Sequence, residues 1–184
     1  LKPNSNFTFQ TFDDGPNKRK ELAQILHGTL EQHLPVLKKL SSQGAGVFVM
    51  VNAGDGKGRS KENVKRIRAV WIDCDGVPLP DKWMLEPHII VESSPGKFHV
   101  YWLVSDVPVK TFSTLQKALA KHYGTDTSVS DENRVMRLPG FYHRKHEPVM
   151  VVLRKALDHA HYTLAEVCQA MPFLQQALDE VEDK

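Results

Sequence analysis

Two aspartates separated by a single residue, Asp73 and Asp75, follow the apolar run at 69–72 and precede Gly76. Because side chains alternate along a strand, both carboxylates point to one side of it, with Cα atoms about 6.6 Å apart, and Cys74 points to the other side. Neighbouring carboxylates repel each other unless a cation neutralises them, so the pair is suited to hold divalent ions. The alternative is a strand that ends in acidic turn residues, because so short a motif is weak by itself.

A third carboxylate is available at Asp126 or at Asp131, in a polar stretch that runs over 124–133. Two or three carboxylates that converge on Mg²⁺ or Mn²⁺ are what nucleotidyl transfer needs. One ion promotes attack by a 3′-hydroxyl, and the other neutralises the leaving pyrophosphate. Taken singly, each of these two aspartates is better explained as a solvated turn residue. The residues themselves leave the choice between the two open.

The segment at 93–99 brings Ser94, Lys97 and His99 together around the Pro95–Gly96 pair. It joins two apolar runs by so short a loop that a hairpin is predicted. Its hydroxyl, backbone N–H and ammonium groups could all donate hydrogen bonds to a triphosphate. Strand alternation puts His99 on the polar side of the second strand, together with Lys97. A solvated surface hairpin with a packed histidine is the alternative.

Two arginines, Arg134 and Arg137, lie three residues apart in the segment that leads into Leu-Pro-Gly. Arginine is the natural bidentate partner of phosphate, so both could contact a nucleotide or a nucleic-acid strand. Surface ion pairs with Asp131 and Glu132 are the alternative explanation. The basic cluster at 143–146 could contact a template or primer backbone, although a solvated charge run explains it better.

Apolar periodicity predicts the elements that position these residues. Strands are expected at 7–12, 46–52, 68–76, 88–92, 98–104 and 149–153. Helices are expected over 18–42, with a second helix starting at Pro35, and over 60–67, 109–123 and 163–182, the last with a break near Pro172. Because strands and helices intermix and the short loops favour hairpins, we expect an α+β fold around a mainly antiparallel sheet.

The composition is that of a soluble globular chain: 184 residues, 41% hydrophobic and 25% charged. A formal net charge of +2 creates no overall basic field of the kind that marks many nucleic-acid binders. Cys74 and Cys168 have no zinc spacing and suggest a reducing compartment. There is no secretory signal and no apolar run of membrane-spanning length, so we expect a cytoplasmic protein without a membrane partner. The chain begins with Leu1, from which we expect a domain of a longer protein.

The motifs also follow one another in an informative order. An apolar strand that ends in Asp-x-Asp precedes Ser-x-Gly-x-x-His, and Asp-x-x-Val-x-x-x-Asn-Arg-x-x-Arg-Leu-Pro-Gly comes last. This order resembles the archaeo-eukaryotic primase (AEP) superfamily, most closely the RepB-type primases and primase-polymerases of plasmids, phages and related mobile elements. The resemblance covers about residues 6–155. It implies an N-terminal α/β unit plus an RRM-like, mainly antiparallel sheet with flanking helices, with the active site in the cleft between the two.

The resemblance also implies roles for individual residues. Two divalent ions, Mg²⁺ or Mn²⁺, would be held by the carboxylates of Asp73, Asp75 and Asp126, with Asp131 as the competing third ligand. The phosphates of the incoming nucleotide, or for the arginines the template strand, would be contacted by Ser94, Lys97, His99, Arg134 and Arg137. Of these, Lys97 is not strictly required by the family's motif. No zinc module is recognisable, so no zinc is predicted.

The activity implied is template-directed nucleotidyl transfer by two-metal-ion catalysis. The chain would be a DNA primase, or a primase-polymerase, that makes primers for the replication of a mobile element in a bacterial cytoplasm. Its partners would be a single-stranded DNA template, NTPs or dNTPs, and a replicative helicase domain or protein. We expect residues 1–155 to form the catalytic domain and residues 156–184 to form a helical extension that begins an accessory domain.

Two other functions stand as alternatives. The Asp-x-Asp-Gly-Val sequence at 73–77 also resembles the nucleophile motif of haloacid-dehalogenase-type phosphatases, with Asp73 as the nucleophile, although that motif normally opens a doubly wound parallel fold. A non-catalytic, RRM-like module that binds single-stranded nucleic acid would instead present aromatic residues on its sheet, and Phe98, Tyr101 and Trp102 are available. A pure binder of polyanions gains nothing from the acidic pair, because the carboxylates repel its ligand.

Overall fold

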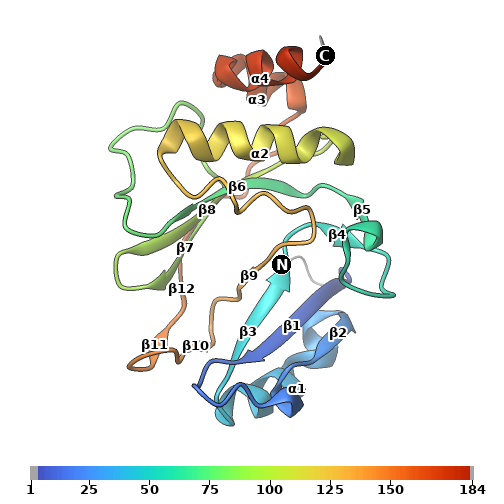
Figure 1. Ribbon diagram of the computed structural model, residues 1–184, viewed down its shortest axis with the longest axis vertical. Helices are drawn as coiled ribbons and strands as arrows, with labels where there is room; N and C mark the ends of the chain where they lie inside the picture. Colours follow the sequence, from blue (N-terminus) through green and yellow to red (C-terminus); the bar gives the residue numbers. More distant parts are fainter. Residues whose placement is uncertain (1–3, 183–184) are drawn as a thin grey trace.

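The computed structural model describes residues 4–182, which form two four-stranded antiparallel sheets flanked by helices. In Figure 1 the N-terminal sheet and α1 form the lower lobe, while the second sheet lies above it, under α2 and the C-terminal helices. This arrangement confirms the expected α+β class with mainly antiparallel sheets. No helix within residues 4–182 is long and apolar enough to cross a membrane.

The N-terminal sheet has the strand order β2-β1-β3-β9. Its strands are β1 (Phe7–Asp13), β2 (Ile25–Gly28), β3 (Ala45–Met50) and β9 (Val135–Arg137). Helix α1 (Leu30–Ser42) packs against this sheet. A separate apolar core holds the unit together: Phe9, Leu37, Val47, Leu138 and Phe141. Because β9 comes from the distant arginine motif, that motif is bonded to the N-terminal unit rather than to the second sheet.

The helix expected over 18–42 is wrong in its first half, because residues 25–28 form β2 and pair with β1. The apolar residues of that segment fit a helix or a strand equally well, and pairing with β1 decides the outcome. The helix itself begins at a capping box. Thr29 Oγ1 accepts the Gln32 N–H at 3.2 Å, and Gln32 Oε1 accepts the Thr29 N–H at 2.9 Å. Pro35 therefore lies inside α1 and does not start a second helix.

The helix expected over 60–67 is wrong as well. The segment contains a single 3₁₀ turn, η2 (Lys61–Asn63), after which β5 (Val64–Arg66) pairs with β4 (Ala53–Gly54). Asn63 Nδ2 donates to both carboxylate oxygens of Asp55, at 3.1 and 3.2 Å. These hydrogen bonds and the β4–β5 pairing hold the chain in an extended course after Asn63, so the helix does not continue.

The second sheet has the strand order β12-β7-β8-β6. Its strands are β6 (Ala69–Cys74), β7 (Ile89–Ser94), β8 (Lys97–Leu103) and β12 (Val152–Ala156). The hairpin between β7 and β8 is confirmed, and Gly96 at its turn has a φ of +73°, which glycine adopts without strain. A small ribbon of β10 (Tyr142–His143) and β11 (Val149–Met150) follows the arginine motif.

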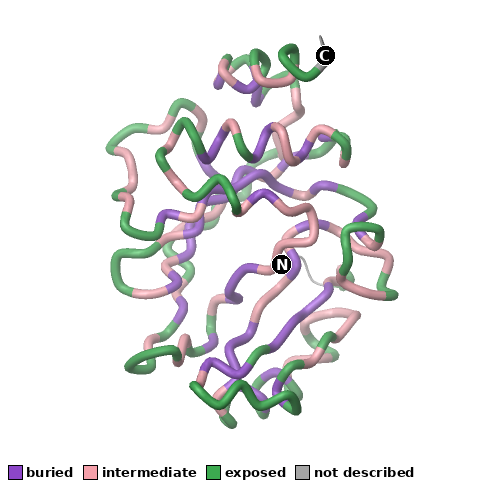
Figure 2. The backbone as a smooth tube through the Cα atoms, in the orientation of Figure 1, coloured by how far each residue is buried: buried purple, intermediate pink, exposed green. Residues whose placement is uncertain are grey.

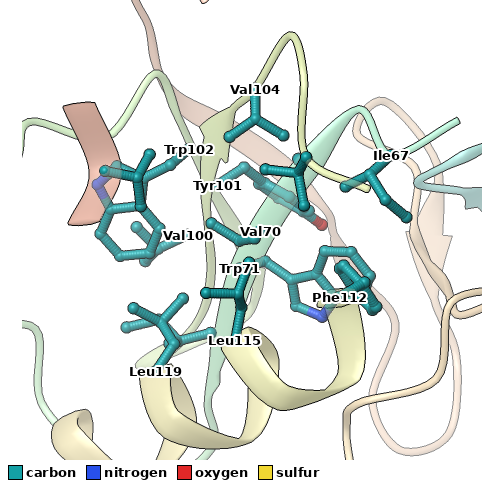
Figure 3. Close-up of a cluster of buried hydrophobic side chains, with 14 of the residues drawn as sticks. Ile67, Val70, Trp71, Val100, Tyr101, Trp102, Val104, Phe112, Leu115 and Leu119 are labelled. Carbon is teal, nitrogen blue, oxygen red and sulfur yellow. The ribbon is translucent and has the colours of Figure 1, made fainter. Parts of the chain in front are cut away.

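Helix α2 (Val109–Tyr123) closes the main core by packing on β6. Figure 3 shows Phe112, Leu115 and Leu119 of α2 beside side chains of the sheet such as Trp71 and Val100, and all five are buried. In Figure 2 the buried stretches run along β6 and β8 and the side of α2 that faces them. The core thus lies directly behind the strand that ends in the two aspartates.

Two C-terminal helices, α3 (Leu164–Ala170) and α4 (Pro172–Glu182), lie on the other side of α2 in Figure 1. Their break at Pro172 is as expected. They contribute to the main core rather than standing apart from it, through Val167, Cys168, Met171 and Leu174. The division of the chain into 1–155 and 156–184 stays a prediction.

Candidate active site

The acidic pair lies at the end of β6, next to the hairpin that carries the phosphate-binding candidates. In the β6–β8 register Asp73 is opposite His99, and the His99 Nε2 to Asp73 Oδ1 distance is 3.8 Å. Lys97 Nζ lies 2.7 Å from Asp75 Oδ1. Strand pairing therefore brings together two motifs that the sequence places about two dozen residues apart, as the motif order implied.

Asp73 is the more buried member of the acidic pair, with 30% of its side chain exposed against 63% for Asp75. Burial raises the pKa of Asp73, and repulsion from Asp75 and Asp126 raises it further, while Arg134 and Lys97 act in the opposite direction. Asp126 is thus close enough to act on the charge of Asp73, and its role as the third metal ligand stays a prediction. The competing candidate, Asp131, instead pairs with Arg134 at 2.7 Å.

The three carboxylates fit divalent ions in their chemistry but are not gathered around a common point. Asp126 accepts hydrogen bonds from the backbone N–H and the hydroxyl of Ser128, both at 2.8 Å, and these bonds lower its pKa. Within residues 4–182 no group of three or more His, Cys, Asp or Glu side chains is close enough to hold a metal ion. The repulsion between Asp73 and Asp75 is what a bound cation relieves, and the Lys97 ammonium group already partly neutralises Asp75.

His99 is a buried, uncharged imidazole. Burial, followed by repulsion from Arg137 and His143, lowers its pKa to about 4, so its ring is neutral at physiological pH. At 3.8 Å its contact with Asp73 is too long for a hydrogen bond, and a neutral ring makes no ion pair. Its Nδ1 is buried without a hydrogen-bond partner. The ring therefore keeps hydrogen-bonding capacity at the base of the cleft.

Arg137 is held by a residue that the motifs did not reveal, Asp14. Its Nη1 and Nη2 each donate to the Asp14 carboxylate at 2.9 Å, and its guanidinium lies over the Phe48 ring, 4.7 Å from the centroid. Asp14 also accepts the Arg144 N–H at 2.9 Å. Burial alone would raise the pKa of Asp14, but the bonds from Arg137 and Arg144 outweigh it and lower the pKa.

The backbone at Gly46 makes room for this ion pair. A Cβ on Gly46 would lie 2.6 Å from Arg137 Nη1 and 2.8 Å from both carboxylate oxygens of Asp14. Asp14 follows β1 in a segment that the sequence marks only as a turn, and its partner lies 123 residues away. No local pattern could therefore have identified it.

A cleft of about 740 Å³ unites these residues. Asp126 and its competitor Asp131 are not among the residues that line it. The other predicted site residues do line it, namely Asp73, Asp75, Ser94, Lys97, His99, Arg134 and Arg137. The basic segment after β9 supplies another wall through His143, Lys145 and His146. The cleft thus combines a pair of carboxylates with several cationic hydrogen-bond donors. This combination suits a polyanionic ligand that binds together with a divalent cation.

Comparison with known proteins identifies the family of this chain. A sequence model of the RepB DNA-primase N-terminal domain matches residues 72–177, which is more than half of the chain. The chain belongs to this RepB primase family. The matched segment contains every residue of the three motifs, from Asp73 to Arg137, and the predicted resemblance is confirmed.

Solved structures show the same fold. The chain superposes on primase RepB′ with a TM-score of 0.70 at 20% identity, over 98% of this chain and 59% of that one. For the AEP domain of the primase-polymerase of cyanophage S-2L the TM-score is 0.68 at 21% identity, over 90% and 89% of the two chains. The catalytic domain of RepB′ in complex with initiator DNA gives 0.69 at 20% identity, over 98% and 89%.

A curated relative is longer than this chain. A replication protein of Clostridium perfringens is 23% identical over 138 residues, which is 64% of this chain and 34% of that protein. The match thus spans about a third of the relative's length. The phosphatase alternative fails at the level of fold, because in residues 4–182 the strands of each sheet pair antiparallel rather than in a doubly wound parallel sheet.

Proposed function

We propose that this RepB-family chain is the catalytic domain of a primase, and that it performs template-directed nucleotidyl transfer on single-stranded DNA. One observation carries the proposal. The Asp73–Asp75 pair, which suits metal ions, lies directly beside Lys97 and His99, which suit phosphates, along a single cleft. A binding module has no use for that combination, because the carboxylates would repel its ligand.

Asp73 and Asp75 would hold the divalent ions, with Asp126 as the third carboxylate once it turns from Ser128. Bound Mg²⁺ or Mn²⁺ supplies charge neutralisation and activation of the attacking hydroxyl. In the free protein Lys97 neutralises Asp75, and it becomes available to a phosphate when a stronger cation takes its place. Burial keeps the His99 ring neutral, so the ring can donate one hydrogen bond to a phosphate oxygen without adding charge.

The partners proposed are a single-stranded template and NTPs or dNTPs, and in the whole protein a replicative helicase. The DNA complex of RepB′ and the description of the curated relative as a replication protein support a place in DNA replication. We further propose that the system is a plasmid or phage replicon, since the primase-polymerase that shares this fold comes from a phage.

The test is a synthesis assay on unprimed single-stranded DNA with Mn²⁺ or Mg²⁺ and labelled NTPs or dNTPs. We expect short products from the wild type and none from Asp73→Asn or Asp75→Asn. The matched control is Asp158→Asn, which changes an exposed carboxylate two residues after the end of β12. That end of β12 pairs with Ile89, the first residue of β7, whereas Ser94 is the last residue of β7. Failure of the wild type on every template, primed or unprimed, would overturn the proposal. Extension of supplied primers alone would refute initiation but keep nucleotidyl transfer.

A further inference from the structure

A second cavity, of about 670 Å³, lies between the two sheets and is here called the inter-sheet groove. Phe7 and Val49 of the N-terminal sheet form one wall, and Val91, Tyr101 and Leu103 of the second sheet form the other. Along β8, Tyr101 and Leu103 alternate with Val100 and Trp102, so the groove lies on the opposite side of the strand from those core residues. Its volume is within the range of about 300–1,000 Å³ that is usual for ligand sites.

The basic residues that line the inter-sheet groove are Arg66, Arg68, Arg137 and His161. No Asp or Glu from the described part of the chain lines it. Arg137 is already neutralised by Asp14, so Arg66 and Arg68 dominate the potential there. An apolar wall edged by positive charge is complementary to single-stranded nucleic acid, whose bases are apolar on their faces and whose phosphates are anionic.

Arg68 has hydrogen-bonding capacity that the protein does not use. Its guanidinium lies over the Phe7 ring, 4.5 Å from the centroid, and its Nη2 donates to the Asn6 carbonyl at 2.8 Å. Its Nη1 is buried without a hydrogen-bond partner. Burial, together with repulsion from Arg66, lowers the pKa of Arg68 to about 10. A phosphate at this edge would relieve the repulsion, and a rotation of the Arg68 side chain would bring Nη1 to it.

We propose that the inter-sheet groove binds a segment of single-stranded nucleic acid. Arg66 and Arg68 contact its phosphates, and the apolar walls at Leu103 and Leu153 contact its bases. The charge of the groove favours this occupant over an apolar peptide or small molecule, which would gain nothing from two arginines. The proposal rests on the proposed function for the identity of the strand as template, but its binding step requires no catalysis.

The test is the binding of a fluorescein-labelled oligothymidylate, followed by anisotropy over a range of salt concentrations without nucleotides or divalent ions. Arg66→Gln, and then Arg66→Gln/Arg68→Gln, should weaken binding several-fold. Each lost phosphate contact should also make the slope of log K against log salt shallower by about 0.7. The matched control is Lys117→Gln/Lys121→Gln, which removes the same charge from exposed positions on α2, outside the groove.

Equal losses in the two pairs, or no loss in either, would overturn the proposal. Arg66 is exposed on the short β5, so the single variant keeps the test valid if Arg68→Gln unfolds the chain, which thermal melting will show. The two proposals fail separately. Loss of binding in the arginine variants of a protein that makes no primers would keep the groove and remove the primase. Unchanged binding by the arginine variants of a protein that does make primers would keep the primase and overturn the groove.

Discussion

Asp14 and Arg137 form a buried ion pair at the side of the cleft, with 2% and 7% of their side chains exposed. Because a buried charge without its partner is costly, Asp14→Ala should lower the free energy of unfolding by about 3–5 kcal/mol. Adding Arg137→Met should recover much of that loss, since no charge then stays unpaired. Urea unfolding measures both. The control is Glu86→Ala, which breaks a more exposed pair with Lys155 and should cost at most about 1 kcal/mol. Equal costs for Asp14→Ala and Glu86→Ala would contradict this account.

His99 gives the site a pH dependence of known sign. Its pKa is about 4 in the folded chain and 6.5 ordinarily, so the unfolded chain binds more protons between these values. The free energy of unfolding therefore falls as the pH drops from about 6.5 to about 4. Over that window the wild type should lose about 3 kcal/mol more than His99→Gln, which cannot titrate. Urea titrations of both proteins at the two pH values check this, and parallel losses would show that His99 is not held neutral.

At the scale of single residues, the sequence predicted contacts between residues close in the chain but not those between residues far apart in it. Asp73 and Asp75 could be placed together because strand alternation is local, and Lys97 because a hairpin joins it to its neighbours. Asp14 could not be foreseen, because its burial depends on β3 joining β1 and the distant β9 in one sheet. Arg137 was expected to face a phosphate, yet its two terminal nitrogens bond to Asp14. Its role in nucleotide binding stays a prediction.

The β7–β8 hairpin is the element that aims Lys97 at Asp75, and its turn requires a positive φ at Gly96. Gly96→Ala should lower the free energy of unfolding by about 1 kcal/mol, because a Cβ is strained in that conformation. For a chain of this size that corresponds to a fall of about 2–4 °C in Tm. Gly96→Asn is the matched control and should cost less, because asparagine tolerates this region. Thermal melting separates the two, and equal Tm values would argue against a strained turn.

Elements with a strong periodic pattern were predictable, and those decided by pairing were not. Helix α2 and the strands β6 to β8 follow their apolar patterns closely. Residues 25–28 carry a pattern that also fits a helix, but they form a strand because they pair with β1. The alternation at 7–12 predicted a strand buried on its Phe side only. Because β1 is a central strand, Thr8 and Gln10 are buried too, while Phe12 is 38% exposed.

The whole molecule depends on its C-terminal helices, since Val167, Met171 and Leu174 complete the core behind α2. Ending the chain at residue 162 would remove all three and expose their apolar neighbours. Because burying one such side chain stabilises a fold by about 1.5–3 kcal/mol, we expect the shortened chain to unfold or to melt far below the full chain. Circular dichroism melting checks this. An unchanged Tm would instead support residues 1–155 as a self-sufficient domain.

The assembly of two sheets around one cleft leads to the central claim, that Asp73 and Asp75 catalyse nucleotide addition directed by a template. The most direct measurement is the dependence of the product on homopolymer templates, with each labelled nucleotide supplied alone. The account predicts that an oligothymidylate directs incorporation of adenine nucleotides only, and that Asp73→Asn abolishes it while Asp158→Asn does not. Incorporation of any nucleotide regardless of template, or synthesis that survives Asp73→Asn, would contradict the account.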